Sequence, residues 1–229
     1  MDRPSPTTLA RLTGALFLIT FATSIPALLL YHSILNDTDF IVGGGGSDGQ
    51  VFLGAFLELL LIVANIGSAL ALFPIVKRQN EGVALGYVTA RVMESAFIAV
   101  GILSLLAITT LRQDGGDAST LVPIGQSLVA IKDWTFVLGP GFVVGIGNGL
   151  LLGYLMYRSG LVPRGMAMLG LIGGPLIVIS GALVVFGVFD QGGVGQGIAT
   201  IPEFCWELSL GIYLLVKGFR AGSPLLAAA

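Results

Sequence analysis

The sequence predicts an all-α fold, a polytopic transmembrane bundle of six helices. Hydrophobic residues make up 55% of the 229 residues and charged residues only 10%, whereas about 25% of the residues in a soluble domain are charged. The mean hydropathy is +0.93. Six segments reach the length of about 20 apolar residues that a membrane-spanning helix needs: 12–34, 51–76, 83–111, 134–157, 165–189 and 198–219.

The first apolar segment follows Arg3 and Arg11, so it begins with the charge pattern of a signal peptide. Its apolar run is too long for a signal peptide, and no convincing cleavage site of small residues follows it. We therefore expect a retained first helix, with a kink or a loosened outer end at Pro26.

The connections between the segments differ in length. Tight turns at 79–82 and 159–164 predict that segments two and three, and segments four and five, form helical hairpins. The connection 113–133 is longer, and its apolar residues recur at helical spacing, which predicts a short helix lying at the outer interface. No stretch fits a soluble domain, so the chain is expected to form a single integral membrane domain, 1–229.

The basic residues predict the orientation of the bundle. If six helices alternate in direction, most lysines and arginines fall on one side: Arg3, Arg11, Lys77, Arg78, Arg158, Arg164, Lys217 and Arg220. The loops of the other side carry aspartates: Asp37, Asp39, Asp48, Asp114, Asp117 and Asp190. Because basic loops prefer the cytoplasm, both termini are expected to be cytoplasmic.

The composition also argues against several classes of function. The net charge of -2 argues against nucleic-acid binding, which needs a concentrated basic face. A single cysteine excludes an internal disulfide, and a single histidine, His32, leaves no cluster for a zinc site. We expect no metal and no cofactor. The chain lacks a Gly-x-Ser-Gly nucleophile and paired intramembrane aspartates, so we do not expect an enzyme.

Five ionisable residues lie inside segments that are otherwise apolar: Glu58, Arg91, Glu94, Glu203 and Glu207. Charge at bilayer depth costs roughly 2.5–3.5 kcal/mol per residue on insertion scales, so we expect these side chains to face the inside of the bundle. Arg91 and Glu94 share one helix face, and Glu203 and Glu207 share another, because each pair has helical spacing.

We expect these residues to form one polar cluster, with Arg91 against Glu94 or Glu207, and with Glu58 and Glu203 closer to the outer mouth. One arginine cannot neutralise four glutamates, so some of them are expected to be protonated, hydrated or reached by Lys132. Three further residues are accessory candidates: Asn65 on the face of Glu58, Asp133 as a cluster member or an interfacial cap, and Trp206 as a wall of the cluster or a lipid-facing side chain.

Three interpretations of the cluster stay open. The charges form a structural ion-pair network in a sensor or assembly protein, or they bind or pass a small solute, ion or proton, or they serve intramembrane catalysis. The second interpretation leads. In it, Arg91 fixes an anionic group or pairs with Glu94, while Glu207 or Glu203 exchanges protons.

Small residues in the fourth segment predict close helix packing. Gly141, Gly145, Gly149 and Gly153 recur at intervals of four residues, and this spacing forms a groove where another backbone approaches closely. We expect the fifth segment to fill this groove, and a homodimer seam or a substrate path are the alternatives.

Several motifs resemble a bacterial membrane family called domain of unknown function 4386. The motifs run from Ala71 to Arg78, from Arg91 to Glu94, from Lys132 to Gly141, from Leu152 to Ser159 and from Trp206 to Gly218. The resemblance implies a multi-pass protein of the bacterial inner membrane and implies no particular activity. Arg91, Glu94 and Glu207 match the family pattern, whereas Glu58 and Glu203 are included on physical grounds alone.

Overall fold

The computed structural model describes residues 5–227, which are almost entirely helical and contain no strand. Six helices are long and apolar enough to cross a membrane, which confirms the predicted fold class. They are α1 (Pro6–Leu30), α3 (Asp48–Val76), α4 (Glu81–Asp114), a continuous helix Ala118–Ser159, α7 (Arg164–Val185) and α8 (Val194–Val216). The described residues also form three short helices, α2 (His32–Asn36), η1 (Phe40–Val42) and α9 (Pro224–Ala227). Arg3 lies outside the described residues.

Short polar side chains cap the starts of α1, α3 and α4. Ser5 accepts a hydrogen bond from the backbone N–H of Thr8 at the start of α1. Ser47 and Gln50 form a capping box at the start of α3, and Asn80 caps α4. These contacts satisfy backbone donors that have no partner in the first helical turn.

The fourth span differs from the sequence prediction. Residues 121–131 are helical, but they do not form a separate interfacial helix. The helix Ala118–Ser159 runs through α5 (Ala118–Phe136), η2 (Val137–Val143), η3 (Gly145–Leu152) and α6 (Gly153–Ser159). No glycine or proline lies between residues 121–131 and the apolar span that begins at residue 134. Instead Pro140 and the glycines lie where the chain adopts wider π-helical turns, because proline cannot supply the usual α-helical hydrogen bond.

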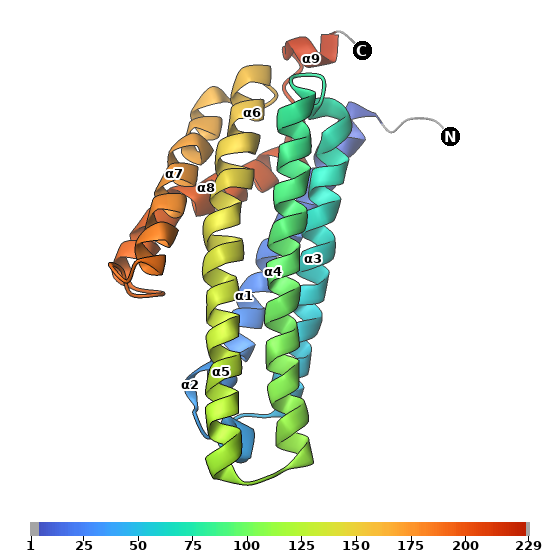
Figure 1. Ribbon diagram of the computed structural model, residues 1–229. Helices are drawn as coiled ribbons and strands as arrows, with labels where there is room; N and C mark the ends of the chain where they lie inside the picture. The colour runs from blue at the N-terminus through green and yellow to red at the C-terminus, as the bar shows by residue number, and fades with distance from the viewer. Residues whose placement is uncertain (1–4, 228–229) are drawn as a thin grey trace.

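The helices pack mainly against their neighbours along the chain. α3 packs against α4, α4 against the helix 118–159, and α7 against η3 and α8, while α1 lies against both α3 and α8. The start of α1 and the helix α9 lie at the same end of the bundle (Figure 1). We call this the basic end, because Lys77, Arg78, Arg158, Arg164, Lys217 and Arg220 lie there. The end with α2, η1 and the α4–α5 turn is called the acidic end.

The helices differ in reach. α7 has 22 residues, or roughly 33 Å, whereas α4 has 34 residues, or roughly 51 Å. The connection between α7 and α8 therefore stops well short of the acidic end that α4 and α5 reach (Figure 1). At the acidic end, α2 and η1 fold against this longer part and form a second apolar core that includes Tyr31, Phe40 and Leu105.

Candidate functional site

Arg91, Glu94 and Asn65 form a closed polar triad between α3 and α4. Arg91 Nη1 lies 2.7 Å from Glu94 Oε2, and Arg91 Nη2 donates to Asn65 Oδ1 at 2.6 Å. Asn65 Nδ2 in turn donates to Glu94 Oε1 at 3.0 Å. All three residues are at most 5% exposed. The hairpin of α3 and α4 places Asn65 beside Arg91 and Glu94, which lie on one face of α4.

The triad is closed on the side of α1 by an aromatic ring. The Arg91 guanidinium carbon lies 5.6 Å from the centre of the Phe17 ring, and Phe17 is fully buried. A cation over an aromatic face is stabilised by the ring's electrons. The buried Nε of Arg91 has no hydrogen-bond partner among residues 5–227, so the guanidinium does not use all of its five N–H donors.

α8 adds a second set of polar groups to the inside of the bundle. Asn148 donates from its side-chain amide to Glu207 Oε1, and the Trp206 indole donates to the backbone oxygen of Asn148 at 3.0 Å. Trp206 is fully buried and packs over Gly170, where a Cβ atom would lie 2.7 Å from its indole nitrogen. Trp206 therefore walls the cluster and does not face lipid.

Glu203 lies one helical turn from Glu207 and is 2% exposed. Within the described part of the chain, neither of its carboxyl oxygens has a hydrogen-bond partner. The side chain fits between two glycines, because Cβ atoms at Gly149 and Gly173 would lie 2.8 and 2.9 Å from its Oε2. A buried polar group without a partner is costly, so this carboxyl group needs a proton, a water molecule or a cation.

Glu58 belongs to a different site, about two helical turns from Asn65 on α3. Lys132 Nζ lies 2.7 and 2.8 Å from the two oxygens of Glu58. The expectation of one cluster is therefore corrected, because the structure contains two separate groups of charges. The expectation that Lys132 reaches a glutamate agrees with these distances. Gly101 on α4 provides the room, since a Cβ there would lie 2.9 Å from Lys132 Cδ.

Tyr31 completes this second group, and sequence reasoning missed it as a site residue. Its hydroxyl donates to Glu58 Oε2 at 3.0 Å, and Lys132 Nζ lies 5.0 Å from the centre of its ring. Burial and the nearby charge of Glu58 raise the pKa of the Tyr31 hydroxyl, so it remains a donor. Its position near a helix end gave no signal of this role.

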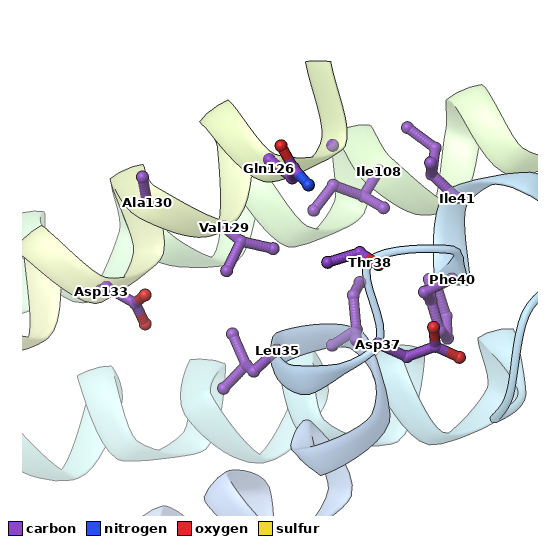
Figure 2. A pocket seen from close by; sticks show the side chains of 12 residues that line it. Leu35, Asp37, Thr38, Phe40, Ile41, Ile108, Gln126, Val129, Ala130 and Asp133 are labelled. Carbon is purple, nitrogen blue, oxygen red and sulfur yellow. The ribbon is translucent and has the colours of Figure 1, made fainter. Parts of the chain in front are cut away.

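Asp133 is not part of either group. It lines a pocket of about 160 Å³ at the acidic end, formed by α2, η1, α4 and α5 (Figure 2). The pocket is mostly apolar, with Ile41 and Val129 among its walls. A second carboxylate at the pocket, Asp37, accepts from the backbone N–H groups of Asp39 and Gly45 and so holds its own loop.

The family assignment follows from a comparison of the whole chain with known families. The family described as domain of unknown function (DUF4386) matches residues 12–218. The chain belongs to this family. No curated protein and no solved structure matches the chain.

The region matched by DUF4386 contains every residue of the two charge groups, from Tyr31 to Glu207. It also contains the glycines of the fourth span. Gly145, Gly149 and Gly153 face α7, and a Cβ at Gly149 would lie 2.3 Å from Gly174 Cα. Gly141 is an exception, because its nearest side-chain neighbour is Gln196 at 3.9 Å. The glycine groove is thus filled by α7 of the same chain.

Proposed function

We propose that this DUF4386 protein binds a proton, or a small cation, at the carboxyl groups of Glu203 and Glu207 and passes it through the bundle. The observation that carries this proposal is Glu203, a buried carboxyl group with no hydrogen-bond partner in the described residues. Ionisable groups inside membrane spans are rare and commonly mark ion or proton pathways.

The charge balance supports the same function. Arg91 is the one basic residue of its group in residues 5–227, and it pairs with Glu94, whereas Glu207 and Glu203 form no ion pair there. One positive charge leaves two carboxyl groups without compensation. A proton or a cation at these groups would remove the cost of burying charge that lacks a partner.

The geometry favours a proton or cation over an anionic solute. Both Nη atoms of Arg91 already donate to protein groups, Glu94 and Asn65. The remaining N–H groups of the guanidinium, that of Nε included, lie beside the Glu94 carboxylate, which repels a second anion. The buried acceptors that lack a hydrogen-bond partner are instead the carboxyl oxygens of Glu203, and these attract protons and cations.

A non-transporting role in assembly or sensing is the second candidate. It is supported by the triad of Arg91, Glu94 and Asn65, in which two helices are joined by hydrogen bonds that need no ligand. In this role, the charges specify which helices pack together. The two candidates differ in what neutralisation of Glu203 should do.

The test is proton flux into liposomes that contain the purified full chain and an internal pH-sensitive dye. A potassium gradient with valinomycin supplies the driving voltage, and a sodium-sensitive dye in parallel vesicles reports cation flux. We expect flux above that of empty liposomes, and we expect Glu203→Gln to abolish it while the protein remains folded. Glu81→Gln, the same chemical change at an exposed position on α4, should leave the flux intact.

Two results would count against the proposal. If the wild-type protein gives no more proton or sodium flux than empty liposomes, passage is excluded under a voltage that should drive it. If Glu203→Gln lowers thermal stability in detergent but leaves flux unchanged, the carboxyl group has a packing role.

The proposal places the protein in the bacterial inner membrane with its basic end in the cytoplasm. This orientation is supported by the lysines and arginines at the basic end and by the aspartates in the opposite loops. A proton would then enter from the acidic end and reach Glu203 before Glu207, because α8 runs toward the basic end.

A further inference from the structure

Three arginines from different parts of the chain line one pocket at the basic end. They are Arg158 at the end of α6, Arg164 at the start of α7 and Arg220 after α8. The pocket has a volume of about 290 Å³, close to the lower limit of about 300 Å³ for small-molecule sites. This pocket lies apart from both charge groups described above.

The polypeptide backbone holds the arginines together. The N–H of Arg220 donates to the Leu161 backbone oxygen at 2.9 Å, and the Ser223 hydroxyl donates to the Ser159 backbone oxygen at 2.8 Å. Ser159 and Ser223 are both 1% exposed. The segment after α8 is thereby fixed across the α6–α7 turn, so the three charges are brought together by a buried framework.

Among residues 5–227, the pocket contains no compensating negative charge. None of its lining residues is acidic, and the ion pairs found in residues 5–227 involve none of the three arginines. Arg164 lies 5.6 Å from the centre of the Tyr157 ring, which orients its guanidinium without neutralising it. The start of α7 adds the partial positive charge of a helix N-terminus. Like charges that line one pocket repel one another, and an anion between them removes this repulsion.

We propose that this pocket binds a phosphate group. Guanidinium groups match phosphate oxygens through paired hydrogen bonds, and three of them can surround one phosphate. The arginines lie at or just beyond the ends of three membrane spans, Ala118–Ser159, α7 and α8, which is the level where lipid headgroups are found. The phosphate comes either from an anionic lipid or from solution, and the experiment separates these sources.

The experiment measures binding to the purified full chain in neutral detergent. Thermal unfolding is followed during titration with phosphatidylglycerol, with phosphatidylcholine and with inorganic phosphate. A ligand that binds only the folded state raises the melting temperature. If the site takes a headgroup, phosphatidylglycerol raises it and the other two do not. If the site takes soluble phosphate, inorganic phosphate alone is sufficient.

Either result supports the proposal only if the arginines are required. The variant Arg158→Gln/Arg164→Gln/Arg220→Gln should lower the apparent affinity roughly a hundredfold, because each lost guanidinium contact to the phosphate weakens binding about fivefold. The control Arg11→Gln/Lys77→Gln/Lys217→Gln removes equal charge from exposed residues of the same end and should bind as the wild type does.

Single variants at Arg164 and Arg220 provide the test if the triple variant misfolds. Each should weaken binding about fivefold. The proposal is overturned if no ligand stabilises the wild type. It is also overturned if the pocket variants and the control variant lose affinity equally, because charge at the basic end would then act without a defined site.

Discussion

The Arg91 guanidinium donates to the Asn65 carboxamide at 2.6 Å, although the two residues come from different helices and both are almost fully buried. Asn65 also donates to Glu94. One uncharged side chain therefore holds both members of a buried ion pair in place. This arrangement joins α3 to α4 in the middle of the bundle.

Replacement of Asn65 by leucine should destabilise the protein. Asn65→Leu preserves the approximate volume but leaves a guanidinium N–H and a carboxylate oxygen without a partner, and each such loss costs about 1–3 kcal/mol. The free energy of unfolding, measured by titration with sodium dodecyl sulfate in mixed micelles, should fall by about that amount or more. Thr89→Val is the control, because Thr89 is exposed and its hydroxyl bonds only within α4. Equal losses in both variants would refute a specific role for Asn65.

Removal of one member of the Glu58–Lys132 pair should be more damaging than removal of both. Lys132→Met leaves Glu58 with Tyr31 as its hydrogen-bond donor, and breaking a buried ion pair costs about 3–5 kcal/mol. The double variant Glu58→Gln/Lys132→Met should recover a substantial part of this loss. The same micelle titration measures the two variants, and a double variant less stable than Lys132→Met would contradict direct pairing.

Two glycines that face neighbouring helices should not tolerate a methyl group. At Gly149 a Cβ would lie 2.3 Å from the Gly174 backbone, and at Gly173 it would lie 2.5 Å from the Glu203 backbone nitrogen. Gly149→Ala and Gly173→Ala should each cost about 1–3 kcal/mol through overpacking. Gly165→Ala and Gly197→Ala are the controls, since a Cβ at either position meets no atom within 4 Å. Melting temperatures in detergent should fall for the first pair alone.

The six spans could be predicted because hydropathy and length decide whether a helix crosses a membrane. The pairing of Arg91 with Glu94 was also accessible, because their spacing in one helix places them on one face. The position of Lys132 was not accessible in this way. The sequence placed it in an outer interfacial helix, whereas the continuous helix Ala118–Ser159 carries it into the bundle beside Glu58.

The division of the charges into two groups could not be predicted, because it depends on which helices lie side by side and at what height. The role of Asn148 in the site could not be predicted for a related reason. Its side chain reaches Glu207 from a π-helical stretch, and helical spacing rules assume α-helical turns.

The orientation can be tested with a membrane-impermeant maleimide on intact bacteria. The starting protein carries Cys205→Ser, since Cys205 is the single cysteine of the chain. Ala118→Cys places a thiol at the acidic end and Gly165→Cys places one at the basic end, both at exposed positions. We expect labelling of the first in intact cells and of the second only after permeabilisation, because basic loops stay in the cytoplasm. The reverse pattern would show the opposite orientation.

Infrared difference spectroscopy tests most directly whether the buried carboxyl group of Glu203 exchanges a proton. Spectra of the reconstituted protein are compared between acidic and alkaline pH, for the wild type and for Glu203→Gln. We expect the wild type to show the carbonyl band of a protonated carboxylic acid that titrates with pH, and we expect this band to be missing from Glu203→Gln and retained in Glu81→Gln. Identical spectra for the wild type and Glu203→Gln would contradict proton binding at Glu203.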